Sequence, residues 1–124
     1  MQPPSPVILV VDDDDFVRNI SIRILKEAGY RVSAARNGLE ALEQLYQSCP
    51  DLLITDSSMP ELDGSALIQE ARSRFPELPI LRISGSFGAS PARDRLPSDI
   101  GTLDKPFDHD ELLEAVSRLA GPPA

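Results

Sequence analysis

Continuous apolar runs alternate with amphipathic stretches along this chain. Val7–Val11 and residues 52–54 are unbroken apolar runs, which are typical of strands buried on both faces of a sheet. Residues 79–84 and 102–104 predict two further strands, and the weak alternation in residues 30–35 predicts a more exposed one. The pattern therefore indicates five strands.

Apolar residues recur at helical spacing after four of these strands. Asp15 is the expected N-cap of the first helix, and Gly29 follows its end. Asp108 and Glu111 have the spacing of a capping box at the start of the last helix. The expected helices lie in residues 16–28, 39–46, 66–75 and 109–119. In the second helix, the expected buried stripe consists of Leu39, Leu42, Leu45 and Tyr46.

The alternation of strands and helices predicts the fold class. Short connections between such elements imply a parallel sheet with helices on both faces. Residues 85–101 break the pattern, because their glycines and prolines leave room for about one helical turn. We predict an α/β fold with a single doubly wound five-stranded parallel sheet and a fourth helix that is short or disordered. Residues 1–6 are expected to form a flexible lead, residues 7–120 the domain and residues 121–124 a tail.

Composition and charge narrow the class of protein. The chain has 124 residues, a net charge of −8 and one cysteine, Cys49. The length fits one domain, and the charge argues against nucleic-acid binding by this domain alone. No apolar stretch approaches the roughly 20 residues of a membrane span, and the N-terminus lacks signal-peptide features. Because a single cysteine forms no internal disulfide, we expect a cytoplasmic location. The absence of a long apolar stretch leads us to expect no membrane partner.

Polar side chains of chemical interest lie at the ends of four predicted strands. Asp12 and Asp13 follow the first strand, Asp56 the third, Ser84 ends the fourth, and Lys105 follows the fifth. In a parallel sheet the carboxyl ends of the strands lie at one edge, where open α/β sheets bind their ligands. These five side chains are therefore expected to form one site.

The chemistry of this set suits a phosphoryl group. Three carboxylates about 5 Å apart repel one another by roughly 3 kcal/mol per pair at an effective dielectric constant near 20. A Mg²⁺ ion relieves this repulsion, since it prefers oxygen ligands and keeps waters that a phosphate can replace. Lys105 adds a positive charge and Ser84 a hydroxyl donor. Asp56 could then attack phosphorus and form an aspartyl phosphate.

Four short motifs resemble the receiver domain of two-component response regulators, a family that includes the chemotaxis response regulators. The resemblance covers about residues 7–120 and implies the flavodoxin-like strand order 2-1-3-4-5. The motifs are Val10-Val11-Asp12-Asp13-Asp14, then Asp56-Ser57-Ser58-Met59-Pro60 with Asp63-Gly64, then Ser84-Gly85, and finally Lys105-Pro106-Phe107.

The resemblance implies a role in a phosphorelay. Asp56 would be the phosphoacceptor, and it would take a phosphoryl group from a phosphohistidine on a sensor histidine kinase or a histidine phosphotransfer protein. Asp12 and Asp13 would hold Mg²⁺ together with Asp56 and the backbone carbonyl of Ser58. Such a domain is a signalling switch and not an enzyme in the usual sense. The resemblance does not identify its downstream effector. It leaves open whether two copies pair as a homodimer.

The resemblance also implies how the phosphoryl group would be held and read out. Ser84 would hydrogen-bond it, and Lys105 would pair with it. Receiver domains usually carry an aromatic residue three positions before this lysine, whereas this chain has Thr102. We therefore expect phosphorylation to change residues 85–101 instead of driving the usual aromatic swing.

Two alternatives stay open at this point. Asp12-x-Asp14 after an apolar strand resembles the nucleophile motif of haloacid-dehalogenase-type phosphatases, in which Asp12 would carry the phosphoryl group. The chain is short for the core and cap of that family, and Met59-Pro60 with the following Asp63-Gly64 would have no role in it. The other alternative is a pseudo-receiver, which binds partners through the same fold without being phosphorylated.

Overall fold

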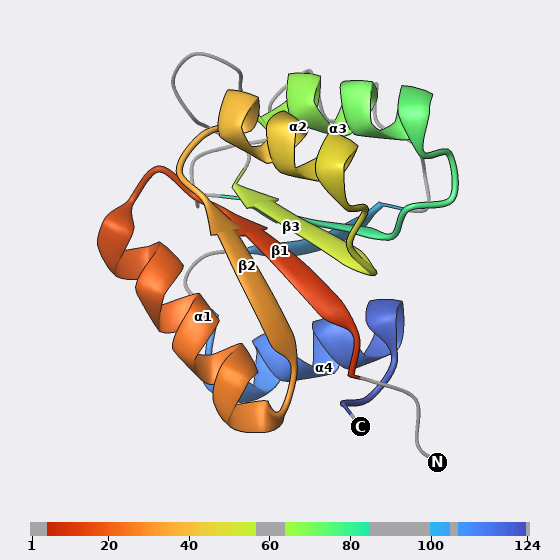
Figure 1. The fold of residues 1–124 in the computed structure, drawn as a ribbon. Helices are drawn as coiled ribbons and strands as arrows, with labels where there is room; N and C mark the ends of the chain where they lie inside the picture. The colour runs from red at the N-terminus through yellow and green to blue at the C-terminus, as the bar shows by residue number, and fades with distance from the viewer. Residues whose placement is uncertain (1–4, 57–63, 85–99, 105–106, 124) are drawn as a thin grey trace.

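The computed structural model describes residues 5–56, 64–84, 100–104 and 107–123, which form one sheet with helices on both sides (Figure 1). Strands and helices alternate in this part of the chain as the apolar pattern predicts. The described elements are β1 (Val7–Val11), α1 (Asp15–Ala28), β2 (Arg31–Ala35), α2 (Gly38–Gln47), β3 (Leu52–Asp56), α3 (Gly64–Arg74), β4 (Ile80–Ser84), β5 (Gly101–Asp104) and α4 (His109–Ala120).

The sheet is parallel throughout, with its strands in the order β2-β1-β3-β4-β5. The predicted doubly wound α/β fold is confirmed, as is the strand order that the family resemblance implied. β1 and β3 are adjacent inner strands, with Ile8 opposite Leu52 and Val11 opposite Thr55. Because the strands are parallel, the residues that end or follow β1 and β3 meet at the same edge of the sheet.

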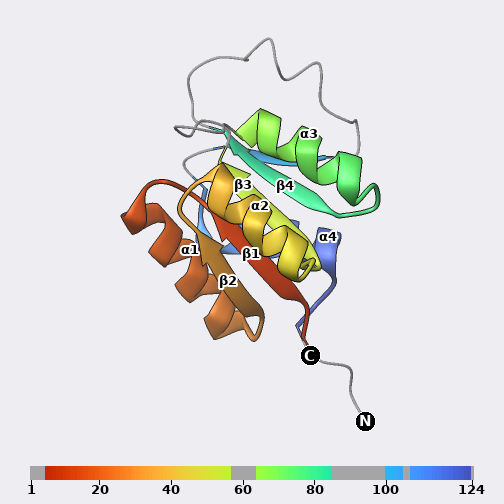
Figure 2. The same cartoon turned by 45° about the horizontal axis from the view of Figure 1, so that its top comes forward.

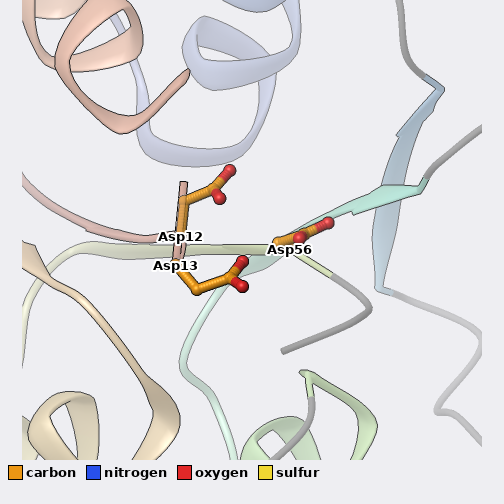
Figure 3. Close-up of side chains that lie close together, drawn as sticks. All are labelled: Asp12, Asp13 and Asp56. Carbon is orange, nitrogen blue, oxygen red and sulfur yellow. The ribbon is translucent and has the colours of Figure 1, made fainter. Parts of the chain in front are cut away.

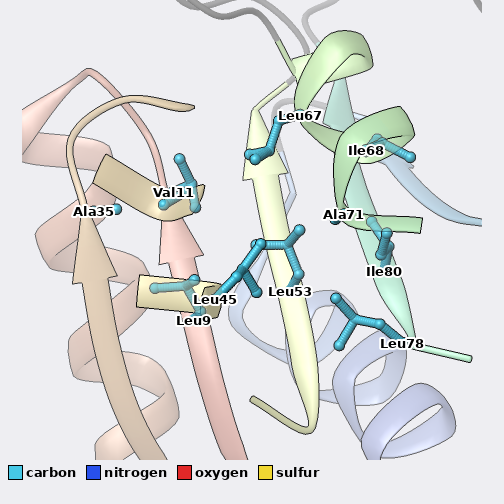
Figure 4. Close-up of a cluster of buried hydrophobic side chains, with 11 residues drawn as sticks. Leu9, Val11, Ala35, Leu45, Leu53, Leu67, Ile68, Ala71, Leu78 and Ile80 are labelled. Atoms are coloured by element: carbon cyan, nitrogen blue, oxygen red, sulfur yellow. The ribbon is translucent and has the colours of Figure 1, made fainter. Parts of the chain in front are cut away.

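Helices cover both faces of this sheet (Figures 1 and 2). α1 and α4 lie against one face, and α2 and α3 lie against the other. All five residues of β3 are buried, as expected for a strand covered on both sides. Figure 4 shows the cluster on the α2/α3 face, which includes Leu9, Leu53, Ile80, Leu45 and Ala71. The cluster on the α1/α4 face includes Ile8, Ile54, Leu81, Leu25 and Val116.

The helix ends follow capping chemistry, with one correction to the prediction. Asp14 caps α1 in place of the expected Asp15, because its carboxylate accepts the backbone N–H groups of Phe16 and Val17 at 2.9 and 3.1 Å. Gly29 ends α1 as predicted, in the left-handed conformation (φ 107°) that glycine adopts without strain. The capping box at the start of α4 is also confirmed.

The predicted apolar stripe of α2 is wrong in part. Ala41 and Leu45 are the buried residues of this helix that belong to the core cluster. Leu39 and Tyr46 are instead 55% and 52% exposed. Tyr46 lies beside α3, where its hydroxyl donates to the Glu70 carboxylate at 3.0 Å. α2 is therefore turned so that alanine, and not tyrosine, faces the sheet.

Part of the prediction concerns residues 85–101, of which the structure describes 100 and 101. The expected short or disordered fourth helix lies outside the described residues. β5 begins at Gly101, one residue before the predicted strand. A Cβ atom at Gly101 would lie 2.8 Å from Cδ1 of Leu119, so glycine allows α4 to pack closely against β5. The longest helix in the described ranges, α1, has 14 residues, and none of these helices has the length and apolar character of a membrane span.

Candidate functional site

Three carboxylates converge at the carboxyl edge of the sheet (Figure 3). Asp12 and Asp13 follow β1, and Asp56 is the last residue of β3. One carboxylate oxygen from each of the three lies within 4.8 Å of the others. We call this group of three side chains the acidic notch. The structure thus brings together three of the five side chains that sequence analysis assigned to one site.

Short local contacts fix the first of these carboxylates. Asp12 is only 4% exposed, and its carboxylate accepts the backbone N–H of Asp14 at 2.9 Å. The backbone N–H of Asp12 donates to the carbonyl of Ala35 at 3.3 Å, which extends the pairing of β1 with β2 by one residue. Since Asp14 caps α1, the turn after β1 both begins the helix and orients Asp12.

Asp56 is held by its place in an inner strand. It is 8% exposed and lies opposite Ile83 of β4, whereas the preceding Thr55 is fully buried. The Thr55 hydroxyl donates to the backbone carbonyl of Asp56 at 3.0 Å. Two of the three carboxylates in the acidic notch are therefore buried, and Asp13 is exposed.

Arg18 is a supporting residue that sequence analysis missed. Its Nη1 atom donates to the backbone carbonyl of Asp12 at 2.9 Å, and its Nη2 atom pairs with the carboxylate of Asp15. The Arg18 side chain is 11% exposed, although it comes from the first turns of an amphipathic helix. Arg18 follows the acidic run by about one helical turn, and this spacing could have indicated a contact with that run. Arg18 connects α1 to the turn that carries the acidic notch.

The acidic notch fits a small divalent cation. Two oxygens bound to one Mg²⁺ are about 3 Å apart when adjacent and about 4 Å apart when opposite, because the metal–oxygen distance is about 2 Å. The three oxygens, which lie within 4.8 Å of one another, are close to this spacing. All are hard carboxylate ligands, which Mg²⁺ prefers. The repulsion among three closely placed negative charges favours the same ion.

The other predicted site residues are described only in part. Ser84 ends β4 opposite Asp104 of β5, which places its backbone at the same edge of the sheet as the acidic notch. Lys105 and Ser58 lie outside the described residues. Thr102, at the position where the family usually has an aromatic residue, is exposed and lies opposite Arg82 of β4.

Arg82 is the second residue whose placement sequence analysis did not anticipate. It is 4% exposed in a strand whose other described side chains are buried and apolar. The interruption of the apolar run Ile80-Leu81 by arginine was visible in the sequence, but its burial was not. A buried guanidinium is uncommon and stays charged at any physiological pH.

Comparison with known proteins decides the family. The sequence model of the response regulator receiver domain matches residues 8–117. The chain belongs to the response regulator receiver domain family. The receiver protein CpdR of Brucella abortus is 35% identical over 114 residues, which cover 90% of this chain and 94% of CpdR. The solved structure of the chemotaxis protein CheY4 of Vibrio cholerae matches with a TM-score of 0.83 and 30% identity, over 93% of this chain and 98% of that one.

Receiver sequences also occur as parts of larger relatives. The sensor kinase CckA of Brucella abortus is 36% identical over 119 residues, which cover 93% of this chain but 12% of CckA. The chain likewise spans 24% of the transcriptional regulator NtrC of Escherichia coli. The family membership therefore describes this domain, whereas the activities of such longer proteins belong to them.

Proposed function

We propose that this receiver domain accepts a phosphoryl group on Asp56 in a histidine-to-aspartate phosphorelay and depends on Mg²⁺ to do so. The observation that carries the proposal is the convergence of Asp12, Asp13 and Asp56 within 4.8 Å at the carboxyl edge of the sheet. Receiver family membership supports this function over that of a haloacid-dehalogenase-type phosphatase. The intact acidic notch supports it over that of a pseudo-receiver.

The residues of the acidic notch have two roles in this proposal. Asp12 and Asp13, with Asp56 and the backbone carbonyl of Ser58, would hold Mg²⁺. The bound ion would neutralise negative charge on the phosphoryl oxygens and on the carboxylates around them. Asp12 is oriented for this role by the N–H of Asp14. Exposed Asp13 leaves the acidic notch open to solvent.

Asp56 is the nucleophile of the proposed reaction. One oxygen of its carboxylate attacks phosphorus in the phosphohistidine of a sensor histidine kinase or histidine phosphotransfer protein. The bond from phosphorus to the imidazole nitrogen breaks, and that nitrogen keeps the electron pair. The product is an acyl phosphate on Asp56. Lys105 would pair with the transferred group, and Ser84 would donate a hydrogen bond to it.

The proposal extends to the setting of the domain. Residues 7–120 would form the phosphorylated unit, acting as a signalling switch in the cytoplasm. It would assist its own phosphorylation and dephosphorylation, and otherwise it would not be an enzyme. Its negative charge favours a protein partner over nucleic acid.

Labelling with a small phosphodonor tests the proposal. The protein is incubated with acetyl phosphate and Mg²⁺, and mass spectrometry then locates the phosphoryl group. We expect one group on Asp56, none after Asp56→Asn, and none when Mg²⁺ is chelated. Asp51→Asn is the matched control, because Asp51 lies at the opposite end of β3 and is exposed. Labelling of Asp12, or normal labelling of the Asp56→Asn variant, would contradict the proposal.

A further inference from the structure

We propose that buried Arg82 is a long-range electrostatic partner of the acidic notch, which weakens Mg²⁺ binding and strengthens binding of the phosphoryl group. This inference rests on the proposed function, since it concerns the same site. Arg82 would act as a positioning charge and not as a catalytic residue, because it acts through the interior of the sheet.

The first observation is the burial of the charge. Arg82 is 4% exposed, and its Nε and Nη1 atoms are both buried. Arginine remains protonated even in the interior of a protein, so this position carries a fixed positive charge. Screening by water and salt is weak for buried charges. The field of the guanidinium therefore extends further than that of an exposed arginine.

The second observation is the side of the sheet on which Arg82 lies. Neighbouring residues of a strand point to opposite faces. Leu81 and Ile83 belong to the cluster on the α1/α4 face, and Ile80 belongs to the cluster on the α2/α3 face. The side chain of Arg82 therefore leaves the sheet on the α2/α3 face, the same side as Thr55.

The third observation is the closeness of Arg82 to Asp56. Arg82 lies directly opposite Thr55 in the pairing of β3 with β4, and Asp56 is the next residue. Strands about 4.8 Å apart with a rise of about 3.3 Å per residue place the Cα atoms of Arg82 and Asp56 roughly 6 Å apart. The backbones of Arg82 and the proposed phosphoacceptor are thus one strand spacing and one residue apart, although Asp56 pairs with Ile83 and its side chain leaves the sheet on the other face.

Small residues flank Arg82 in the two neighbouring strands. Arg82 lies between Thr55 on β3 and Thr102 on β5 at the same level of the sheet. Both residues are small compared with arginine, and both carry a hydroxyl group. A bulky side chain at position 102 would stand beside Arg82 on the same face, since strand neighbours in register point the same way. The small Thr102 is therefore compatible with a buried arginine beside it.

Electrostatics gives the direction of the effect on each ligand. A fixed positive charge near the acidic notch repels a divalent cation, so it lowers Mg²⁺ affinity. The same charge attracts the negative charge that a phosphoryl group adds. Removing the charge should therefore strengthen Mg²⁺ binding and weaken binding of the phosphoryl group. A residue with a purely structural role would weaken both.

The test compares Arg82→Met with Arg82→Lys. Mg²⁺ binding is measured by calorimetry, and binding of beryllofluoride, an anionic phosphoryl mimic, is measured at saturating Mg²⁺. For Arg82→Met we expect Mg²⁺ affinity to rise and beryllofluoride affinity to fall, each by about three- to tenfold. Arg82→Lys keeps the charge and should stay near the wild-type values. Arg82→Gln is a second neutral variant in case the methionine variant does not fold.

The controls separate this inference from the proposed function. Arg23→Met removes the same charge from an arginine whose side chain is 81% exposed, and it should change neither affinity. Unchanged affinities in both neutral variants, or affinities that fall together, would overturn the role of Arg82 while leaving Asp56 as the phosphoacceptor. Absence of Mg²⁺ binding and labelling in the wild-type protein would instead overturn the proposed function.

Discussion

The four consecutive aspartates, Asp12 to Asp15, have different structural roles. Asp12 is buried in the acidic notch, and Asp13 is its exposed member. Asp14 caps α1, and Asp15 pairs with Arg18. Asp12 and Asp13 lie close to Asp56 in the acidic notch (Figure 3). An acidic run in a sequence can therefore contribute both to a cluster of carboxylates and to the start of a helix within one turn of chain.

Asp13→Asn should separate repulsion within the acidic notch from metal binding. With a chelator present, we expect this variant to be more stable than wild type by about 1 kcal/mol, because it removes one of three mutually repelling charges from a solvent-screened position. With Mg²⁺ present, the stabilisation by the metal should fall because one ligand is lost. Urea denaturation with and without Mg²⁺ measures both effects.

Asp15→Asn provides the comparison for that prediction. Asp15 is also exposed and acidic, but it lies outside the acidic notch. Its variant should keep the full stabilisation by Mg²⁺. If Asp13→Asn retained that stabilisation as well, Asp13 would not be a metal ligand.

The sequence predicted the three carboxylates of the acidic notch but not the burial of the two arginines described above. The positions of Asp12, Asp13 and Asp56 after two apolar runs were enough, since parallel strands bring such residues to one edge. The burial of Arg18 and Arg82 was not predictable in this way. Arginine usually lies at the surface, and only the packing of neighbouring elements shows when it does not.

At the level of secondary structure, the start of α1 depends on one side chain. Asp14→Ala removes the acceptor for the N–H groups of Phe16 and Val17, and we expect a loss of about 1 kcal/mol in the free energy of unfolding. Asp15→Ala, one residue later, should lose less than half of that because its ion pair is at the surface. Chemical denaturation of both variants tests the assignment. Equal losses would contradict Asp14 as the cap.

The face of α2 provides a second comparison within one helix. Leu45→Ala should destabilise the protein by about 2–5 kcal/mol, because Leu45 is fully buried in the α2/α3 cluster. Leu39→Ala, which removes the same atoms from a residue that is 55% exposed, should change stability by no more than about 0.5 kcal/mol. Thermal denaturation distinguishes the two. Similar losses would mean that α2 presents the face that its apolar spacing suggested.

The apolar spacing of α2 was misleading for a physical reason. Leucine and tyrosine recur at helical intervals on two overlapping stripes, and spacing alone does not select one of them. Tyr46 is held beside α3 by Glu70, whose hydrogen bond raises the pKa of the tyrosine, and the Arg74 guanidinium lies 5.5 Å from the centre of its ring. The apolar spacing within α2 carries no information about such contacts with a neighbouring helix.

At the level of the whole molecule, the alternation of predicted strands and helices was enough to predict the fold class. It was not enough to predict the order of the strands in the sheet. Apolar runs separated by helices predicted a parallel sheet with two covered faces, because parallel strands need crossover connections. Alternation alone leaves the positions of the strands in the sheet undetermined. The order 2-1-3-4-5 came from resemblance to the receiver family and is confirmed by the observed pairing.

One contact joins distant parts of the chain across the α1/α4 face. The hydroxyl of Tyr30, just after α1, donates to the carbonyl of Gly121, just after α4, at 2.8 Å. Tyr30→Phe should therefore cost about 1 kcal/mol at neutral pH, since Tyr30 is 5% exposed and the carbonyl would lose a direct partner. Tyr46→Phe, at an exposed tyrosine, is the comparison. Urea denaturation would contradict the prediction if both variants matched wild type.

The same tyrosine predicts a dependence of stability on alkaline pH. Burial raises the pKa of Tyr30 above its ordinary value of 10.0. The unfolded chain therefore loses this proton at a lower pH than the folded protein, so folding stability declines as pH rises above 10 and through the folded-state pKa. Tyr30→Phe lacks this contribution. Its stability, measured by denaturation between pH 9 and 11, should decline less steeply than that of wild type.

The inner position of β1 and β3 has a consequence for how such a domain can diversify. Each of these strands is hydrogen-bonded on two sides, so we expect the backbone that carries the carboxylates to be among the last parts of the sheet to open in hydrogen exchange. β2 and β5, at the periphery, have one strand neighbour each. Substitutions in those outer strands would alter the surface at the edges of the sheet and leave the strands that carry the proposed phosphoryl site unchanged. The proposed phosphoryl site could thus stay the same in domains whose outer strands present different surfaces.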